Sequence, residues 1–353
     1  MKEKPDIRII DIAEMAGVSI GTVDRVIHNR GNVSEEKLQK IKAVLKSVNY
    51  TPNIFARSLV SKKRHKIVAL IPAYYPDDYW MYVANGFNKA AAEIKTSGIS
   101  FETLFFDQYD EETFANSIKE LLALEFDGVV MANFFRDHVI HLSKILDAKN
   151  IPYTYIDAHI EDQNPLAYFG MNSYDSGAVA AKIMTGRIDN TADILISHMS
   201  NQKGERSNQV INREKGFLDY IGKSDFSGNI IYVDLNINSA VDNMAALDTV
   251  FEKDVALAIQ GAITFNSTCH VLGNYLKSRN KGIAFLMGYD LIEKNRNLLK
   301  EGVISLLIGQ RPEEQGYKAV RVLTDKLLLN INTDKINYMP IDILIKENID
   351  YYK

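Results

Sequence analysis

Residues 9–29 read Ile-Ile-Asp-Ile-Ala-Glu-Met-Ala-Gly-Val-Ser-Ile-Gly-Thr-Val-Asp-Arg-Val-Ile-His-Asn. Apolar residues recur three or four positions apart on both sides of Gly17, and this spacing predicts two short amphipathic helices joined by a tight turn. Gly17 supplies the backbone freedom that such a turn requires. Ser19 stands where its hydroxyl can cap the second helix by accepting a hydrogen bond from an amide near Thr22. The stretch therefore predicts a helix-turn-helix unit.

The second predicted helix has a buried side and an outward side. Its apolar stripe is formed by Val23, Val26 and Ile27, which we expect to pack against the first helix. The outward side then consists of Ile20, Gly21, Asp24, Arg25 and His28. In DNA-binding helix-turn-helix units, this is the side that meets the major groove. A helical hairpin with no role in DNA binding is the alternative interpretation of the same pattern.

The charge distribution sets the N-terminal segment apart from the rest of the chain. Residues 1–66 carry 14 Lys or Arg against 7 Asp or Glu, whereas the remaining residues carry 27 against 38. The 353-residue chain as a whole has a formal net charge of −4. A basic head on an acidic body is the distribution expected for binding the phosphate backbone of nucleic acid at one end. A solvated basic tail is the simpler alternative.

The composition argues against several classes of protein. A hydrophobic content of 46% and a charged content of 24% are ordinary for a soluble globular protein. The sequence has no run of 18 apolar residues and no apolar segment of a secretory signal at its start. Cys269 is its one cysteine, which excludes an internal disulfide and a zinc site built on several thiolates. We expect a cytoplasmic protein with no cofactor, no metal and no membrane partner.

From residue 65 onwards, short apolar runs alternate with stretches of helical periodicity. The runs occupy residues 67–71, 101–106, 128–132, 153–156, 194–196, 230–233, 262–265 and 284–287. Continuous apolar strands separated by helices predict parallel sheets with helices on both faces. Eight such units exceed one sheet of ordinary size, so we expect two linked α/β lobes. Ligands of such lobes bind at the carboxyl ends of the strands, in the cleft between the lobes.

The N-terminal stretch from Asp11 to Leu59 resembles the lactose-repressor (LacI) family. The resemblance lies in Asp11-Ile-Ala-x-x-Ala16-Gly17-Val18-Ser19-x-x-Thr22-Val23-x-Arg25-Val26-x-x-Asn29, and it continues in Asn49-Tyr50-x-Pro52-Asn53 and Ala56-Arg57-x-Leu59. From residue 66 to about 345 the chain is similar to the type I periplasmic sugar-binding fold that this family carries. The resemblance implies a small all-α helix-turn-helix headpiece plus a two-lobed α/β, periplasmic-binding-protein-like domain with parallel sheets.

The resemblance also implies boundaries. The expected units are a headpiece at 1–52, a hinge helix and linker at 53–64, and an effector-binding and dimerisation domain at 65–353. Within that domain we expect an N-lobe at about 65–160 and 293–322 and a C-lobe at about 161–290 and 323–353. The hinge helix has room for about two turns, and so short a helix is marginal in water without a partner.

The family likeness implies a division of labour among the DNA contacts. Arg25 is expected to read a base directly, because its guanidinium can bridge O6 and N7 of guanine. Leu59 is expected to enter a base step from the minor groove and kink the duplex. The residues expected to contact phosphate are Ser19, Thr22, Asn29 and Asn53.

Two positions of the recognition surface depart from the family. Relatives often have larger polar or aromatic side chains at the positions of Ile20 and Gly21. Ile20 can touch a thymine methyl group, but Gly21 offers no side chain to a base. Asp24 adds a negative charge where a small neutral residue is more usual. We therefore expect specificity to depend on Arg25 and on the deformability of the DNA.

The likeness further implies a sugar-binding set in the loops after the strands. Tyr79 and Trp80 follow the first strand, where relatives place aromatic rings against a sugar; buried core aromatics are the alternative for both. The implied polar contacts are Asp137, for which Asn133 is an alternative, Asp157, His159, Asn172, Arg213, Asn266, Asp290 and Gln310. Carboxylates and amides can pair with two hydroxyl groups at once, which suits a polyol.

The sequence does not identify the ligand. Ala158 and Ser267 replace residues that relatives use, which argues against simple ribose recognition. Arg213 suits an anionic group, so a sugar, a sugar acid and a sugar phosphate are all compatible with the sequence.

These features together predict a transcriptional regulator, a repressor rather than an enzyme. It would bind a pseudo-palindromic double-stranded DNA operator as a homodimer, under the control of a small-molecule effector that is a sugar or sugar derivative. A stand-alone solute-binding protein of a transport system is the alternative. The helix-turn-helix and the lack of an export signal favour the regulator. The sequence leaves open whether the effector releases or promotes DNA binding.

Overall fold

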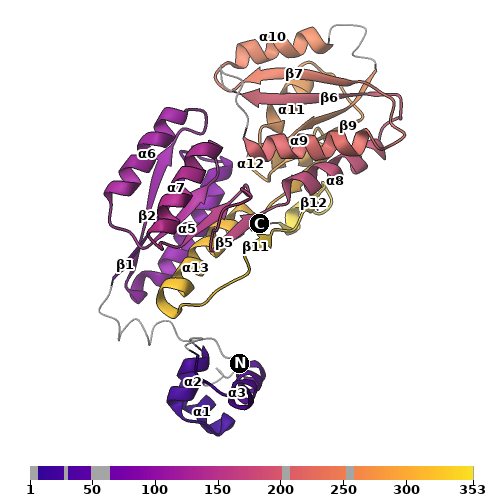
Figure 1. Ribbon diagram of the computed structural model, residues 1–353. Helices are drawn as coiled ribbons and strands as arrows, with labels where there is room; N and C mark the ends of the chain where they lie inside the picture. Colours follow the sequence, from indigo (N-terminus) through magenta and orange to yellow (C-terminus); the bar gives the residue numbers. More distant parts are fainter. Residues whose placement is uncertain (1–6, 28–30, 49–63, 201–206, 252–257, 353) are drawn as a thin grey trace.

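The computed structural model describes residues 7–27, 31–48, 64–200, 207–251 and 258–352. It comprises a helical headpiece and two α/β lobes, with the first lobe between the headpiece and the second lobe (Figure 1). Asn29, Asn53 and Leu59 lie outside the described residues. The predicted hinge and the headpiece boundary at residue 52 therefore stay predictions.

The headpiece is built from three helices around a small apolar core. The helices are α1 (Ile9–Ala16), α2 (Ile20–Ile27) and α3 (Glu35–Ser47). The buried core consists of Ile12, Ala13, Ala16, Val23 and Ile41. These residues come from all three helices, so α3 closes the core that the helix-turn-helix pair begins.

The turn between α1 and α2 has the predicted geometry. Gly17 has a φ of 64° and ends α1 in the left-handed conformation, which a residue without a side chain adopts at no steric cost. The Ser19 hydroxyl oxygen accepts a hydrogen bond from the backbone N–H of Thr22 at 3.3 Å. The predicted turn and the predicted cap are both confirmed.

The first lobe is built on a six-stranded sheet in the order β11-β5-β4-β3-β1-β2, in which all the strand pairs are parallel. Its strands are β1 (His65–Pro72), β2 (Ile99–Phe106), β3 (Gly128–Ala132), β4 (Tyr153–Ile156), β5 (Ala167–Gly170) and β11 (Ile336–Tyr338). Its helices are α5 (Tyr79–Ile94), η1 (Lys95–Ser97), α6 (Glu111–Ala123), α7 (Arg136–Ala148) and α13 (Pro312–Leu329). Although α13 comes late in the chain, it packs beside α5 (Figure 1).

The second lobe repeats this plan. Its sheet has the order β12-β10-β9-β8-β6-β7, with β12 antiparallel to β10. Its strands are β6 (Asp193–Ser200), β7 (Ile230–Asn236), β8 (Ile259–Thr264), β9 (Phe285–Tyr289), β10 (Leu306–Gly309) and β12 (Asp342–Leu344). Its helices are α8 (Ser173–Thr185), α9 (Asn208–Ile221), α10 (Ala240–Phe251), α11 (Cys269–Ser278), α12 (Glu293–Glu301) and η3 (Ile349–Tyr351).

Strand pairing corrects the predicted division of the chain between the lobes. The segment 293–322 was expected in the first lobe, but β10 pairs with β9 and brings α12 with it into the second lobe. Conversely, β5 and β11 pair with each other in the first sheet, although 161–290 and 323–353 were expected in the second lobe. These strands have only three or four residues, too few for hydrophobic periodicity to assign them.

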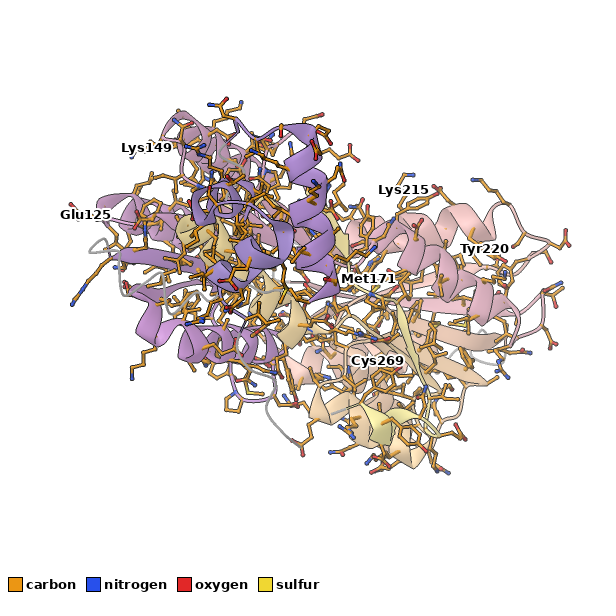
Figure 2. The ribbon with its side chains drawn as sticks, turned by 90° about the horizontal axis from the view of Figure 1, so that it is seen from below. Glu125, Lys149, Met171, Lys215, Tyr220 and Cys269 are labelled. Atoms are coloured by element: carbon orange, nitrogen blue, oxygen red, sulfur yellow. The ribbon has the colours of Figure 1, made fainter. Side chains whose placement is uncertain are left out.

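Three connections consequently cross between the lobes within the described residues. They join β5 to α8, β10 to α13 and β11 to β12. Met171 lies in the first of these connections, is only 1% exposed, and stands where the two lobes meet (Figure 2). The eight predicted apolar runs coincide with strands, and the predicted fold class is confirmed. No described helix is both long enough and apolar enough to cross a membrane.

Candidate functional site

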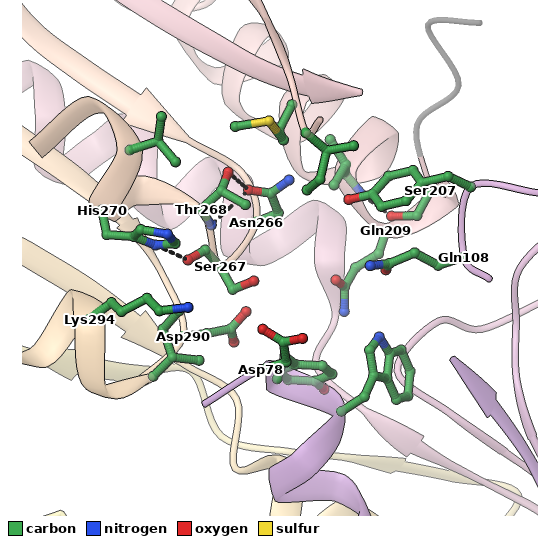
Figure 3. A pocket seen from close by; sticks show the side chains of 18 of the residues that line it. Asp78, Gln108, Ser207, Gln209, Asn266, Ser267, Thr268, His270, Asp290 and Lys294 are labelled. Atoms are coloured by element: carbon green, nitrogen blue, oxygen red, sulfur yellow. Dashed lines mark hydrogen bonds between the residues drawn. The ribbon is translucent and has the colours of Figure 1, made fainter. Parts of the chain in front are cut away.

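A cavity of about 850 Å³ lies between the two lobes. Pockets that enclose small organic ligands have volumes of about 300–1,000 Å³, so its size suits such a ligand. Its polar and aromatic lining includes Tyr79, Trp80 and Asp157 from the first lobe and Gln310 from the second. Figure 3 shows further lining residues, which are Asp78 and Gln108 of the first lobe and Ser207, Gln209, Asn266, Ser267, His270, Asp290 and Lys294 of the second.

Two buried carboxylates, one from each lobe, reach this cavity. Asp157 directly follows β4 and Asp290 directly follows β9, and both side chains belong to residues that are 5% exposed. Both residues have left-handed backbones, with φ values of 69° and 70°, a conformation that aspartate tolerates better than most residues. Burial raises the pKa of both carboxyl groups, and that of Asp290 rises to about 6. The two lobes thus present the same group through the same local geometry.

Arg213 lies beside these carboxylates, behind the cavity lining. Its Nη1 donates to the carbonyl of Phe265 at 2.8 Å and its Nη2 donates to Oε1 of Gln310 at 3.0 Å. The guanidinium carbon lies 4.0 Å from the centre of the Tyr289 ring, and the residue is fully buried. Its charge opposes the rise in pKa at Asp157 and Asp290. The Nε donor has no hydrogen-bond partner among the described residues, which is costly for a buried group and leaves it available to an acceptor.

Gln209 joins the two lobes through side-chain hydrogen bonds. Its Nε2 donates to Oδ1 of Asp157 at 2.6 Å and to Oε1 of Gln310 at 3.1 Å. The Nε2 of Gln310 donates in turn to Oδ1 of Asp290 at 2.8 Å. We refer to Asp157, Gln209, Gln310 and Asp290 as the inter-lobe chain. Sequence analysis missed Gln209, because a glutamine in the first turn of an amphipathic helix is unremarkable until its distant partner is known.

The position of Gln209 and Arg213 depends on how closely α9 packs against α8. A Cβ atom on Gly177 would collide with the backbone carbonyl of Arg213, and one on Gly216 would collide with that of Tyr174. Glycine at these two positions therefore permits the short distance between the helices that brings both polar side chains to the inter-lobe chain.

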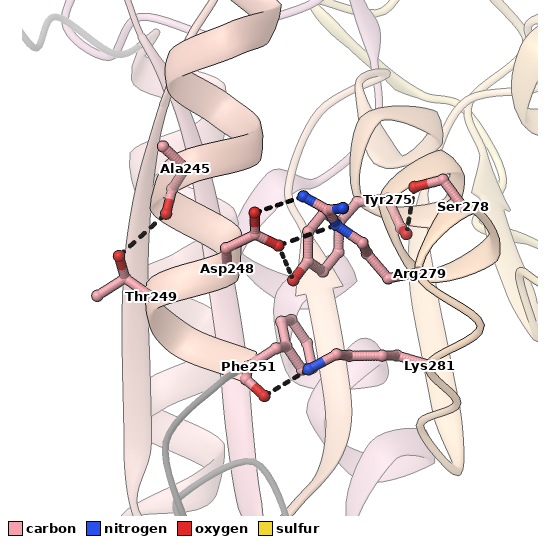
Figure 4. A network of polar contacts seen from close by, with 8 residues as sticks. All are labelled: Ala245, Asp248, Thr249, Phe251, Tyr275, Ser278, Arg279 and Lys281. Carbon is pink, nitrogen blue, oxygen red and sulfur yellow. Dashed lines mark hydrogen bonds and ion pairs between the residues drawn. The ribbon is translucent and has the colours of Figure 1, made fainter.

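The outer part of the cavity is lined by residues of α10 and α11. These two helices are joined by Asp248 of α10, which accepts hydrogen bonds from the Tyr275 hydroxyl and from Nε of Arg279, both at 3.0 Å (Figure 4). Tyr275 takes part in this contact and also lines the cavity, as does Asn243 of α10. The contact thus holds together two helices that line the cavity.

Six of the ten predicted effector residues line the cavity, namely Tyr79, Trp80, Asp157, Asn266, Asp290 and Gln310. The other positions differ. Asp137 is exposed on α7, the ring of His159 packs 5.1 Å from that of Tyr168, and Asn172 caps α8 by accepting from the N–H of Asp175. These three do not line the cavity, because following a strand does not fix the direction in which a side chain points.

The two aromatics predicted to stack on a sugar are buried core residues that also line the cavity. Tyr79 and Trp80 are 7% and 5% exposed and pack edge to face with ring centres 5.1 Å apart. Trp80 also packs on Phe134, 5.8 Å away between ring centres. They belong to the core of the first lobe and at the same time line the cavity. Asn133, the alternative to Asp137, is buried and donates to the carbonyl of Ala158.

The outward side of α2 carries the described part of the predicted DNA surface. Ser19, Ile20, Gly21 and Arg25 are exposed, and Thr22 is partly exposed with its hydroxyl 2.8 Å from that of Ser19. Ile20 is 50% exposed although it is apolar. The helix therefore divides into a buried side and an outward side as predicted.

Comparison with known proteins agrees with both parts of the chain. Residues 8–53 match the family described as bacterial regulatory proteins, lacI family, and residues 68–329 match the periplasmic binding protein domain. A crystal structure of a protein from Bacteroides fragilis, assigned to the LacI transcriptional regulators, is 35% identical with a TM-score of 0.78. It covers 82% of this chain and 100% of that chain.

Curated relatives match over shorter lengths. The HTH-type transcriptional regulator MalR of Streptococcus pneumoniae is 37% identical over 91 residues, which is 25% of this chain and 28% of MalR. The ribose operon repressor of Halalkalibacterium halodurans is 26% identical over 235 residues, which is 66% of this chain and 65% of that protein. The chain thus spans less than two thirds of the length of these relatives. It belongs to the lacI family of bacterial regulatory proteins, with a helix-turn-helix headpiece followed by a periplasmic binding protein domain.

Proposed function

We propose that this protein is a cytoplasmic, sequence-specific repressor of transcription whose affinity for a DNA operator is controlled by a sugar or sugar derivative in the inter-lobe cavity. The observation that carries the proposal is the inter-lobe chain, in which hydrogen-bonding side chains of both lobes meet in a cavity of ligand size. A polyhydroxylated ligand can replace these bonds by its own to both lobes. Its binding energy then depends on how the lobes are placed.

The chemistry of the cavity favours a polyol over a strongly anionic ligand. Asp157 and Asp290 are buried in it, and the charge of the buried Arg213 already acts on both carboxyl groups. The hydroxyl groups of a neutral polyol can donate hydrogen bonds to the carboxylates and accept them from the amide groups of the lining. Tyr79 and Trp80 supply an apolar surface for the C–H faces of a sugar ring.

The headpiece supports the DNA part of the proposal. The outward side of α2 is free of bulky side chains at Gly21 and offers Arg25 for a base and Ser19 and Thr22 for phosphate. The excess of basic residues in the first 66 positions supports attraction to the duplex.

Exposed apolar side chains support a homodimer. Phe105 on the edge strand β2 is 48% exposed, and Tyr75 nearby in sequence to β1 is 80% exposed. In the second lobe, Val241 follows the edge strand β7 and is 79% exposed. Apolar groups at one edge of each lobe suit contact with a second copy, and a two-fold dimer would place two headpieces on a pseudo-palindromic operator.

A solute-binding protein of a transport system is the second candidate, since the two lobes alone suit that role equally. The match of residues 8–53 to the lacI family and the basic headpiece favour the regulator.

Two measurements on the full chain test the proposal. Repeated selection from random duplexes is expected to enrich an inverted repeat. Thermal unfolding in the presence of D-ribose, D-galactose, D-glucuronate and myo-inositol is expected to show stabilisation by at least one of them, because a ligand that binds only the folded state raises its stability. Failure to enrich any duplex would contradict the proposed role as a regulator. Enrichment of an inverted repeat without stabilisation by any of the polyols would contradict the proposed class of effector.

A further inference from the structure

One contact between the lobes lies outside the inter-lobe chain. Asp77, in the loop between β1 and α5 of the first lobe, accepts hydrogen bonds from two backbone N–H groups of α12 in the second lobe. The donors are Glu293, at 2.5 Å from Oδ1, and Lys294, at 3.1 Å from Oδ2. The hydroxyl of Tyr82 donates to the same carboxylate at 3.1 Å. Asp77 itself is absent from the described lining of the cavity, whereas its neighbour Asp78 lines it (Figure 3).

The helix α12 cannot cap its own N-terminus. Its N-cap residue is Ile292, which is 3% exposed and whose side chain has no atom that could accept a hydrogen bond. Isoleucine is among the least favourable residues at this position, because the first N–H groups of a helix have no partner within the helix. Asp77 supplies the missing acceptors from the other lobe, and its charge also interacts favourably with the positive end of the helix dipole.

The loop that carries Asp77 directs it away from its own helix. Asp77 has a φ of 68°, and its backbone N–H points to the sulfur of Met81 at 3.4 Å. The N-cap residue of α5 is Asp78, whose side chain does not cap α5 but accepts from the N–H of Tyr75 at 2.7 Å. Two adjacent aspartates at the start of α5 thus leave this helix without a side-chain cap, and one of them caps a helix of the other lobe.

The capped end of α12 is connected directly to the ligand cavity. Only two residues, Leu291 and Ile292, separate Asp290 of the inter-lobe chain from Glu293. A displacement of α12 relative to the first lobe therefore also displaces the Asp290 carboxylate relative to Asp157. We propose that Asp77 is an inter-lobe latch, a positioning residue that holds the lobes where Asp157 and Asp290 share one cavity.

The consequence for regulation rests on the proposed function. If only the latched arrangement offers both carboxylates to the effector, then loss of the latch raises the apparent dissociation constant of the effector in proportion to the lost population of that arrangement. The latch itself is a property of lobe geometry and can be measured with neither DNA nor sugar present.

The test is a distance measurement between spin labels on the two lobes of the full chain. Lys144→Cys on α7 and Lys223→Cys after α9 place labels at exposed positions, while the native Cys269 is fully buried. Labelled protein diluted with unlabelled protein reports distances within one chain. Asp77→Ala is expected to broaden the distance distribution and shift it to longer distances, and Asp77→Asn, which keeps one acceptor, to give a smaller shift.

Asp110→Ala is the matched control. Asp110 caps α6 within the first lobe by accepting from the N–H of Glu112 at 2.9 Å, so its loss removes the same kind of cap without touching the second lobe. Its distance distribution is expected to equal that of the wild type. Wild-type distributions in both Asp77 variants would overturn the latch and leave the proposed function untouched. Should Asp77→Ala fail to fold, the distance distribution of Asp77→Asn alone tests the latch, and a wild-type distribution in that variant would overturn it.

Discussion

At the scale of single residues, the raised pKa of Asp290 links ligand binding to stability. Burial raises this pKa to about 6, whereas an unfolded aspartate has a value of about 3.9. Between these two values the folded state binds more protons than the unfolded state, so the contribution of Asp290 to the free energy of unfolding increases as the pH falls from about 7 towards 4. The ionised carboxylate of Asp290, which is available to a ligand at pH 7, therefore lowers the free energy of unfolding.

Asp290→Asn tests this account. The neutral amide keeps an oxygen for Nε2 of Gln310 but removes the buried charge, so we expect the free energy of unfolding at pH 7 to rise by about 1–3 kcal/mol. The gain should shrink at pH 5, where the wild-type carboxyl is largely protonated. Urea denaturation of both proteins at the two pH values measures it, and a gain independent of pH would contradict the assignment.

Arg25→Ala tests the residue expected to read the operator. We expect loss of discrimination between the selected duplex and a scrambled one, by about 1–3 kcal/mol, because the bidentate contact with guanine is removed. Weak binding that depends on salt should remain, since the phosphate contacts are unchanged. Lys42→Ala on α3 removes one positive charge from another exposed position and should leave the discrimination intact. Full sequence preference in Arg25→Ala would refute its role.

Residues of the site differ in how far the sequence could predict them. Asp157, Asn266 and Asp290 follow predicted apolar runs, and the carboxyl ends of parallel strands meet at one edge of each sheet. Gln310 was predicted through the family resemblance alone, because β10 before it was not recognised as a strand. Gln209 and Asp77 lack such a signal. Their partners are 52 and 216 residues away, and the contacts exist only because the two lobes meet.

At the scale of elements, the close packing of α8 and α9 positions the inter-lobe chain. Gly177→Ala places a methyl group against the backbone carbonyl of Arg213, so α9 has to move away and take Gln209 and Arg213 with it. Crowding of this kind typically costs about 1–3 kcal/mol, and we expect a lower melting temperature together with loss of stabilisation by polyols. Gly222→Ala is the control, because its Cβ would meet Leu218 at an ordinary 3.5 Å. Equal behaviour of the two variants would contradict this packing argument.

Some strands could be predicted from the sequence and others could not. The eight predicted runs were recognised as strands because their apolar residues are continuous, although the edge strands β2 and β7 are only partly buried. The short strands β5, β10, β11 and β12 were not recognised, and β11 alternates between exposed and half-buried positions. These strands lie beside the lobe crossings, so missing them also misplaced α12.

At the scale of the whole molecule, the two lobes have similar architectures and are held together by several kinds of contact. Three crossing connections, the inter-lobe chain and the Asp77 latch all hold one lobe relative to the other. A ligand that contacts both carboxylates favours one placement of the lobes over others, and the headpiece precedes the first lobe in the chain. If the proposed effector changes the affinity for the operator, thermodynamic linkage requires that the operator change the affinity for the effector by the same factor.

We expect a polyol in the cavity to change the affinity for DNA, and fluorescence anisotropy of the selected operator duplex measures that affinity directly. The titration uses the full chain, with and without the stabilising polyol, and compares the wild type with Asp157→Ala. We expect the polyol to change the operator dissociation constant of the wild type by about 5-fold or more and to leave that of Asp157→Ala unchanged. The same operator affinity with and without the polyol in the wild type, or an equal change in Asp157→Ala, would contradict it.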